Sequence, residues 1–496
     1  MVTILRMSIS HDEDRDAEQA RLLNHEQVRN GIHEEDAQEP LSRSTPPLTH
    51  IIFYFMAIHF LLAFCEMILV APLIKLFENS LCLTFYDFPS DGVKEALCKV
   101  PEIQGPLATI RGWKSSFDMI AVLLVAIPFG RLGDHYGRKK VMSLAVVGVA
   151  FSLLEIYTIC ALPHIFPLRL VWLSSLLLLC GGGLNAASAY MWALAAESIP
   201  ADRRSHAFYY IFSAFYVAEL IGSFIASITI DISPWIPCGL AMASLLICLL
   251  LLALMPNTRK SSSDDAGDQS SKSSGISNIL STLSNRNVIL VIPVFLVGIF
   301  RYTTLNVLIQ YASVRFKLKI STGATFYTET AIVNIILFLF LVPQLSAYIR
   351  KEYEVRPQII DLFLVRTSVT LMCIGCLAIG FTQSSLLLPI GVFIFASGFG
   401  SRVSALSLVS YWIPDDAKAT FFAAIVVFES LGHAIGDPAM QQIFAHSLKL
   451  SNFWWALPFF VGSGLYFCAV VSTSFIRIDG KKLRAQETED MLDHED

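Results

Sequence analysis

Ionisable side chains lie within stretches of sequence that are otherwise apolar, and these residues are the ones able to do chemistry. Glu429, His433 and Asp437 recur every four residues, so a helix would place two carboxylates and an imidazole along one stripe. An imidazole between carboxylates can titrate near neutral pH, which suits a proton relay. Static polar packing is the alternative interpretation, and both remain open.

Other charges interrupt apolar runs in the same way. A charge at the centre of a membrane costs about 3 kcal/mol, so such a residue usually faces the protein interior and is a candidate for binding substrate or protons. Lys114 and Asp118 lie four residues apart on one predicted helical face, where pairing would make them structural. The full set of candidates comprises Glu66, Lys114, Asp118, Glu219, Arg301, Glu329, Arg402, Glu429, His433 and Asp437.

These residues must be positioned by helices that cross a membrane. Of the 496 residues 54% are hydrophobic and 16% are charged, whereas a soluble domain carries about 25% charged residues. A spanning helix needs about 20 apolar residues. Twelve such runs lie at about 50–76, 112–131, 141–162, 168–194, 206–230, 234–255, 287–312, 324–347, 358–382, 385–411, 419–445 and 452–476. The sequence therefore predicts an all-α membrane protein.

Two segments match across the chain at nearly one offset. IPADRRSHAF at 199–208 resembles IPDDAKATFF at 413–422, and AIPFGRL at 126–132 resembles LVPQLSA at 341–347. Duplicated halves around a central site are common in secondary transporters. Glu219 and His433 occupy equivalent positions in this repeat, which predicts that they lie across the pseudo-twofold axis.

Polar segments divide the chain into parts. The expected parts are a disordered cytosolic tail at 1–49, a six-helix bundle at 50–255, a Ser-rich cytosolic linker at 256–286, a second six-helix bundle at 287–476 and a cytosolic tail at 477–496. Lys and Arg are more frequent in the connections on the side of the two tails, which predicts that both termini are cytosolic. The sequence thus predicts two pseudo-symmetric six-helix bundles.

The longest connection on the other side runs from about 77 to 111 and contains Cys82 and Cys98. A disulfide is plausible on the oxidising side of a membrane, and two free thiols are the alternative. The sequence contains no GxxxxGK[ST] loop for ATP, no HExxH and no zinc-type Cys pairs, so we expect neither an enzyme nor a cofactor or metal. The net charge of −5 also argues against nucleic-acid binding.

GRLGDHYGRKK at 130–140 joins the second and third apolar runs. Its glycines permit a tight reversal, its acidic residue can meet the positive end of a neighbouring helix, and its basic cluster suits the cytosolic surface. A plain positively charged hairpin is the alternative interpretation. The segment resembles the signature loop of the major facilitator superfamily. The positions that match are Gly130, Leu132, Asp134, Gly137, Arg138 and Lys139, whereas His135 replaces the usual Arg.

The resemblance implies a fold in which two bundles rock between inward-open and outward-open states around a midplane cavity. It also implies that Asp134 helps to lock the inner gate against the eleventh helix. The wider pattern, including PLRLVWLS at 167–174 and CGGG at 180–183, resembles filamentous-fungal facilitators, many of which export products of neighbouring biosynthetic genes.

We therefore expect secondary transport of a small organic solute, with export of a secondary metabolite or toxic compound as the first hypothesis and proton coupling as a possible energy source. Nutrient uptake is the runner-up, and a non-transporting membrane sensor is the alternative of another class. We expect a functional monomer in the lipid bilayer of the plasma membrane. EQARLL at 18–23 fits a dileucine sorting signal, which makes the vacuolar membrane the alternative location.

Overall fold

The computed structural model describes residues 48–87, 94–255, 285–353, 355–413 and 415–477. The predicted N-terminal tail with EQARLL lies outside the described residues, apart from the first residues of the first helix. The Ser-rich linker up to residue 284 and the C-terminal tail from residue 478 lie outside them too. The described residues belong to one compact unit that begins at Leu48.

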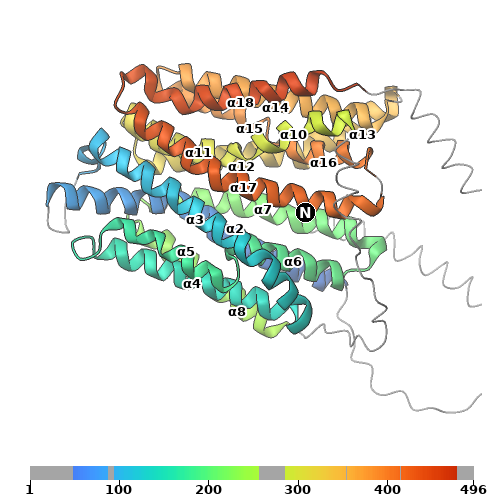
Figure 1. Cartoon of the computed structure of the whole chain (residues 1–496), viewed down its shortest axis with the longest axis horizontal. Helices are drawn as coiled ribbons and strands as arrows, with labels where there is room; N and C mark the ends of the chain where they lie inside the picture. Colours follow the sequence, from blue (N-terminus) through green and yellow to red (C-terminus); the bar gives the residue numbers. More distant parts are fainter. Residues whose placement is uncertain (1–47, 88–93, 256–284, 354, 414, 478–496) are drawn as a thin grey trace, which may run out of the picture. The chain divides into compact units, whose positions relative to one another are not determined.

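The first half of the chain is entirely helical where it is described (Figure 1). Its helices are α2 (Leu48–Tyr86), α3 (Pro101–Tyr136), α4 (Arg138–Ala161), η2 (Leu168–Trp172), α5 (Ser174–Leu177), η3 (Leu178–Cys180), α6 (Gly183–Ser198), α7 (Ala201–Thr229) and α8 (Trp235–Leu254), with the short η1 (Glu95–Cys98) before α3.

The second half is built in the same way. Its helices are α10 (Arg286–Gly298), α11 (Phe300–Arg315), α12 (Ile320–Asn334), η4 (Ile335–Leu341), α13 (Val342–Tyr353), α14 (Pro357–Phe381), η5 (Ser385–Leu387), α15 (Leu388–Ala396), α16 (Ser401–Ser410), α17 (Asp415–Ser447), η6 (Asn452–Ala456) and α18 (Leu457–Ser474). The segment η4 is a π-helix that continues α12 into α13.

Ten segments of the described chain are long and apolar enough to cross a membrane. The long helices α3 and α17 fall outside that set, because they carry many of the charged and polar residues singled out in the sequence. With these two added, the described residues contain the twelve segments that the sequence predicts. The prediction of an all-α membrane protein is confirmed.

The predicted loop at 77–111 is wrong in its bounds. Helix α2 continues to Tyr86 and α3 already begins at Pro101, so the connection is much shorter. The apolar pattern ends where the helix leaves the hydrocarbon, but the helix itself continues, because Glu78 on its last turns pairs with Lys99. Pro101 occupies the first position of α3, where the missing N–H of proline is tolerated.

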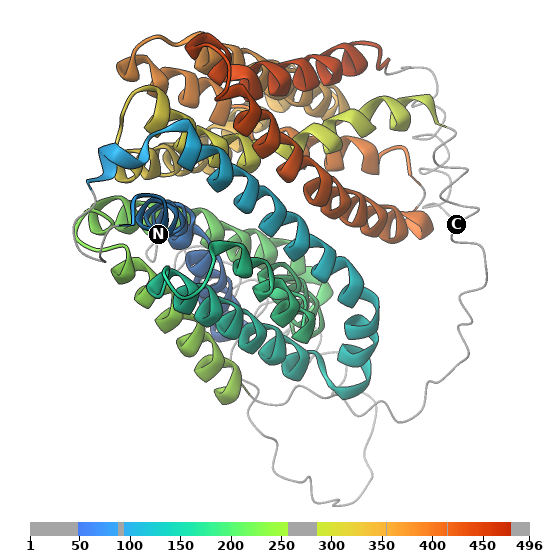
Figure 2. The same ribbon diagram turned by 60° about the vertical axis from the view of Figure 1, so that its left-hand side comes forward.

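The two halves meet along two pairs of helices. Helix α3 packs along α17, and α7 packs along α12. Figures 1 and 2 show α3, in light blue, crossing beside α17, in red-orange. A Cβ atom added at Gly112 of α3 would lie 2.9 Å from the Cα atom of Pro438 and 2.9 Å from the Cβ atom of Gln441. The absence of a side chain at Gly112 therefore permits the close approach of the two helices.

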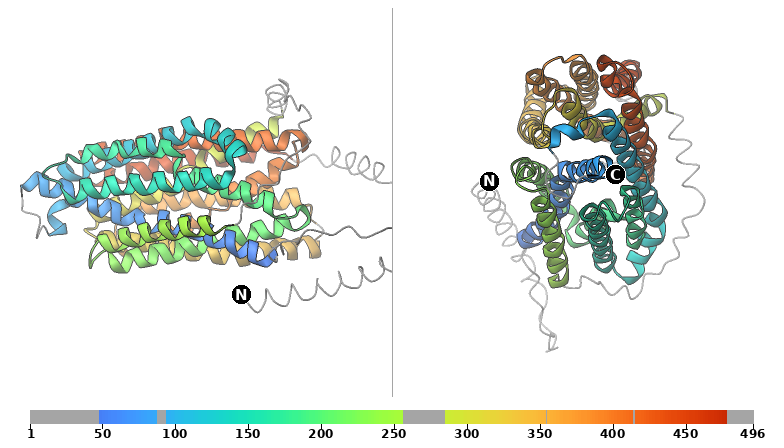
Figure 3. Two further views of the ribbon diagram at one scale, coloured as in Figure 1. Left: turned by 90° about the horizontal axis from the view of Figure 1, so that it is seen from below. Right: turned by 90° about the vertical axis from the view of Figure 1, so that its left-hand side faces the viewer.

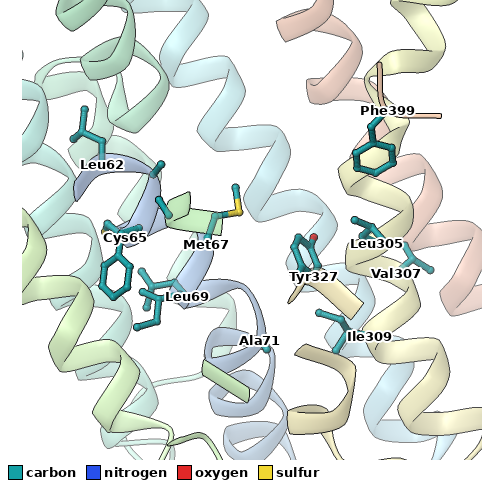
Figure 4. Close-up of a cluster of buried hydrophobic side chains, with 14 of the residues drawn as sticks. Leu62, Cys65, Met67, Leu69, Ala71, Leu305, Val307, Ile309, Tyr327 and Phe399 are labelled. Carbon is teal, nitrogen blue, oxygen red and sulfur yellow. The ribbon is translucent and has the colours of Figure 1, made fainter. Parts of the chain in front are cut away.

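One continuous hydrophobic core contains residues of both halves. Figure 4 shows a part of it, with Met67 of α2 from the first half and Leu305 of α11 and Tyr327 of α12 from the second. Many large apolar side chains elsewhere are exposed, including Leu246, Leu250 and Leu254 on one face of α8. Such a face suits contact with lipid, where the backbone of a helix satisfies its own hydrogen bonds.

The helices run side by side, so the bundle has two ends (Figure 3). We call the end that carries Cys82 and Cys98 the disulfide end, and the end that carries residues 130–140 the motif end. Helices α2, α7 and α11 finish at the disulfide end, and α3, α12 and α15 start near it.

Candidate functional site

The polar stripe on α17 is divided between two different partners. Arg402 of α16 donates two hydrogen bonds to Glu429, at 2.6 Å from Nε and 2.8 Å from Nη2. His433 instead lies 3.6 Å from Asp437, measured from Nδ1 to Oδ1. Bidentate pairing of arginine with a carboxylate is strong and geometrically specific. The stripe therefore contains two separate pairs and not an uninterrupted chain of proton carriers.

Asp437 joins the two halves at the centre of the α3–α17 contact. Its carboxylate accepts a hydrogen bond of 2.5 Å from Ser115 of α3 and another from Thr303 of α11. The neighbouring hydroxyl of Ser116 donates to the carbonyl oxygen of Ala434 at 2.6 Å. A buried charge is stable when hydroxyl donors satisfy its lone pairs, as these do.

Glu66 faces the space between the halves. Its side chain is exposed although it lies in the middle of α2, between Cys65 and Met67, which are buried. It lies within electrostatic range of His433 on the opposite half. Glu66 and His433 therefore supply a carboxylate and an imidazole to one region, from helices of different halves.

Glu219 of α7 is fully buried. Neither of its carboxylate oxygens has a hydrogen-bond partner among the described residues. Arg301 of α11 lies within electrostatic range of it, and Tyr302 and Asn334 of the second half lie beside it. In the described structure, both polar atoms of the Asn334 side chain also lack a hydrogen-bond partner. A buried carboxyl without a partner is costly when ionised, so this group is a candidate proton carrier.

Arg301 is held by aromatic rings, and among the described residues it forms no ion pair with a carboxylate. Its guanidinium carbon lies 5.0 Å from the ring centre of Tyr302 and 5.6 Å from that of Phe399, and Nη1 donates to the carbonyl oxygen of Phe399 at 3.3 Å. These are cation–π distances. An arginine held in this way keeps donors that are available to an anionic or polar solute.

Lys114 and Asp118 form the ion pair that their spacing suggests. Nζ of Lys114 lies 2.5 Å from Oδ1 of Asp118, which also accepts a hydrogen bond of 2.6 Å from Ser175 of α5. These contacts all lie within the first half. Glu329 of α12 is half-buried, and no contact joins it to the other candidates in the described chain.

A polar group missed in the sequence connects the halves nearer the disulfide end. Arg111 of α3 donates to Oε1 of Gln310 on α11 at 3.0 Å, and Gln310 in turn donates to Oε1 of Gln104 at 2.9 Å. Tyr327 of α12 donates to Asn306 at 3.0 Å. The predicted loop had placed Arg111 outside the helices. Uncharged Gln and Asn give little signal in a search for charges.

Four charged side chains form a compact cluster at the disulfide end. We call Lys75, Glu78, Glu95 and Lys99 the charged latch. Lys99 lies 2.7 Å from Glu78 and 2.9 Å from Glu95, and Lys75 pairs with Glu95 as well. Burial alone would raise the pKa of Glu95, but the ammonium groups of Lys99 and Lys75 outweigh it and hold that pKa below its ordinary value.

A disulfide braces the charged latch. Cys82 at the end of α2 and Cys98 at the end of η1 are bonded, with their Cα atoms 5.5 Å apart. Both sulfur-bearing residues are buried with Ile103 in a small apolar cluster separate from the main core. The segment that carries Glu95 is thereby fixed to the first half.

The GRLGDHYGRKK segment forms the turn between α3 and α4. Gly137 has a φ of 97°, in the region that favours glycine, and its N–H donates to the carbonyl oxygen of Gly133 at 2.9 Å. Arg138 pairs with Glu197 at the end of α6 at 3.0 Å, and Lys139 donates to carbonyl oxygens at the end of α8. Cations at helix C-termini are favourable.

The remaining motif residues carry less information. Leu132 packs against the main core, and Gly130 lies within α3. The side chain of Asp134 lies outside the described part of the structure. Its locking of the inner gate stays an expectation from the resemblance.

A cavity of about 590 Å³ lies near the disulfide end between α3, η2 and α17. Trp113, Trp172, Arg169 and Lys449 are among its lining residues, and it contains none of the candidate charges predicted from the sequence. Trp and basic residues are common where helices meet the membrane–water interface. The charges that join the halves, and not this cavity, define the candidate site.

Two fungal efflux pumps are similar to this chain over most of their length. The chain is similar to the MFS efflux pump atnC of Emericella nidulans, with 28% identity over 84% of this chain and 85% of the relative. It is also similar to the efflux pump ustT of Aspergillus flavus, with 27% identity over 78% of this chain and 80% of the relative.

Solved structures show the same fold at low sequence identity. A D-xylose–proton symporter matches with a TM-score of 0.61 and 13% identity over 86% of this chain and 97% of its own. The nucleoside transporter NupG matches with a TM-score of 0.58 and 13% identity over 86% of this chain and 100% of its own. The family model described as Major Facilitator Superfamily matches residues 105–436, and the chain belongs to that superfamily of membrane transporters.

Proposed function

We propose that this transporter exports a bulky, partly apolar organic solute by alternating access of the space between its halves. The observation that carries the proposal is the position of Glu66, Arg301 and His433. Glu66 of α2 lies within electrostatic range of His433 of α17. Arg301 of α11 lies within range of Glu219 and Tyr216 of α7, so both interactions cross the boundary between the halves. The walls of the space between the halves change when the halves move. Residues 50–255 and 287–476 act as the two moving bundles in this proposal.

The lining of the site supports a solute with aromatic or apolar parts. Phe212 stacks on Phe215, and Tyr216 contacts both rings edge-on, so α7 carries an aromatic surface close to Arg301. Aromatic faces bind apolar groups, and the free donors of Arg301 bind a carbonyl or carboxylate oxygen.

The names of two relatives and the contacts at the disulfide end support export as the direction of transport. Two of the relatives are named efflux pumps. At the disulfide end the halves are joined by hydrogen bonds from Lys317 to the carbonyl oxygen of Lys99 and from the N–H of Ile320 to Glu95. In this proposal the motif end is in the cytosol, and a state that is closed at the disulfide end suits loading of solute from the cytosol, the first step of an exporter.

Proton coupling is the energy source that we propose. Glu66 and His433 supply a carboxylate and an imidazole from opposite halves, and Glu219 is a buried carboxyl without a hydrogen-bond partner among the described residues. Arg402 satisfies Glu429, and two hydroxyls satisfy Asp437, so these two residues serve as structural partners. In this proposal the protein acts as a monomer with cytosolic termini and lies in the plasma membrane, with the vacuolar membrane as the alternative location.

A cell-based flux measurement tests the proposal. Cells that express the wild-type chain, the Arg301→Ala variant or no transporter are compared by untargeted mass spectrometry of medium and cytosol. Export predicts solutes enriched in the medium of wild-type cells and retained in the other two. Enrichment inside wild-type cells would instead show uptake, and identical profiles in all three would remove transport of cellular solutes from consideration.

A further inference from the structure

Helix α12 begins at the disulfide end without a cap of its own. Its N-cap residue is Lys319, whose side chain has no acceptor and makes no capping hydrogen bond in the described structure. The first N–H groups of a helix have no partner within the helix, and a missing cap is destabilising. The start of α12 therefore needs an acceptor from elsewhere.

Glu95 supplies that acceptor from the other half of the protein. Its Oε1 atom accepts a hydrogen bond of 3.0 Å from the backbone N–H of Ile320, the first residue of α12. A carboxylate at a helix N-terminus is favoured by the helix dipole as well as by the hydrogen bond. The cap of α12 thus exists only while the two halves are in contact here.

Further contacts hold Glu95 and the start of α12 in position. Lys75 and Lys99 hold its carboxylate from one side, and the Cys82–Cys98 disulfide fixes its segment to the first half. Lys317, which precedes α12, donates to the carbonyl oxygen of Lys99 at 3.2 Å. Lys317 has a φ of 56°, in the left-handed region that non-glycine residues rarely adopt.

We propose that Glu95 is the gate residue of the disulfide end: by capping α12 from the opposite half, it stabilises the state in which this end is closed. The proposal rests on the proposed alternating access and names a residue that positions the halves. Opening the disulfide end removes the cap from α12, and Glu95 then remains paired only with Lys75 and Lys99. Loss of Glu95 removes this bias toward closure.

The test measures the distance between the halves in purified, solute-free protein. Fluorophores are attached through non-cysteine amino acids at Ile232 in the first half and Leu386 in the second, which are 77% and 84% exposed near the disulfide end. Glu95→Ala is expected to raise the ratio of long to short distances about fivefold, the loss of one good cap. An unchanged distribution in folded Glu95→Ala protein overturns the proposal.

A second variant removes the other partner of the hydrogen bond. Ile320→Pro deletes the N–H at a helix position that tolerates proline, and Lys319 already has the extended ψ of 151° that a following proline favours. Ile320→Ala loses the same buried side chain but keeps the N–H, so it is the matched control. Ile320→Pro should open the gate beyond Ile320→Ala, and equal effects of the two would contradict the proposal even if Glu95→Ala did not fold.

Two further comparisons separate the gate from general weakening. In the Glu95→Ala background, Ile320→Pro should open the gate no further than Ile320→Ala, because the hydrogen bond is already lost; a difference between the two as large as in the wild-type background would contradict the proposal. Asp231→Asn removes the exposed cross-half pair of Asp231 with Lys319 at 3.1 Å and should shift the ratio less than twofold. Because the labels report on solute-free protein, failure of the export assay leaves this result intact, and the reverse holds as well.

Discussion

Arg402 on α16 binds both carboxylate oxygens of Glu429 on α17, and this bond separates Glu429 from His433 one helical turn away. The pair lies within the second half and is partly exposed, with 32% of the Arg402 side chain and 14% of the Glu429 side chain accessible. This ion pair acts as a brace, which means that it holds the neighbouring helices α16 and α17 together.

Removing one partner of this brace should destabilise the protein. Arg402→Met leaves Glu429 as an unpaired, mostly buried carboxylate, and we expect a loss of about 1–2 kcal/mol, between the values for exposed and buried pairs. The double variant Arg402→Met/Glu429→Gln should recover most of the loss in thermal unfolding in detergent. A double variant as unstable as the sum of the two single variants would show that the residues do not interact.

The contact of α3 with α17 depends on the size of one residue. In Gly112→Ala, the new Cβ atom would lie 2.9 Å from the Cα atom of Pro438, so the helices must separate. We expect a lower melting temperature. Gly105→Ala on the same helix is the matched control, since the nearest atom to its Cβ is 4.0 Å away. Alanine favours a helix over glycine by about 1 kcal/mol, so Gly105→Ala should be neutral or stabilising; equal losses in both would contradict the packing argument.

Glu219→Gln tests the buried carboxyl that lacks a hydrogen-bond partner in the described chain. The amide has the same shape and cannot ionise, so the burial cost of a charge is removed. We expect an unchanged or higher melting temperature together with a weaker dependence of transport on pH. Glu429→Gln serves as the comparison, because it should lower stability and leave the pH dependence in place. A large loss of stability in Glu219→Gln would reveal a partner that requires the charge.

The charged latch should weaken in acid. The pKa of Glu95 in the folded protein lies below its ordinary value of 4.5, because the nearby Lys99 and Lys75 outweigh the effect of burial. Its contribution to stability is therefore complete above the unfolded pKa and is lost as the pH falls through the folded pKa. Glu78 lies near the Glu95 carboxylate, and Lys319 directly precedes Ile320, the hydrogen-bond partner of Glu95. The charges of both side chains therefore also act on Glu95.

Thermal unfolding of wild type and Glu95→Gln between pH 7 and pH 3 isolates this contribution. Other carboxylates titrate in both proteins, so only the difference in melting temperature is informative. It should be largest near neutral pH and shrink in acid. A difference that grows as the pH falls would reverse the sign of the argument.

Much of the fold could be predicted from the sequence, because lipid imposes a simple rule. A run such as 234–255 has to be long and apolar to span, and α8 occupies Trp235–Leu254. The rule fails where helices leave the membrane. Glu78 lies within α2, because Lys99, distant in the chain, satisfies its charge. No local pattern reports such a partner.

The candidate site was harder to predict for the same reason. Charges at membrane depth identified Glu66, Glu219 and Arg301 as interior residues, but spacing alone grouped Glu429 with His433. In the structure Glu429 instead pairs with Arg402, which lies 27 positions earlier in the chain. The role of Glu95 depends on a backbone N–H of Ile320, and a backbone group has no sequence signal at all.

The first turn of α12 receives its cap from the opposite half, so the turn is complete only while the disulfide end is shut. Each opening exposes the N–H of Ile320 to water, where its hydrogen exchanges with solvent. Deuterium uptake at this single amide therefore reports how much of the time the disulfide end is open, without a fluorophore and without knowledge of the solute. Hydrogen exchange at the first residue of one helix thus becomes a measure of the transport cycle.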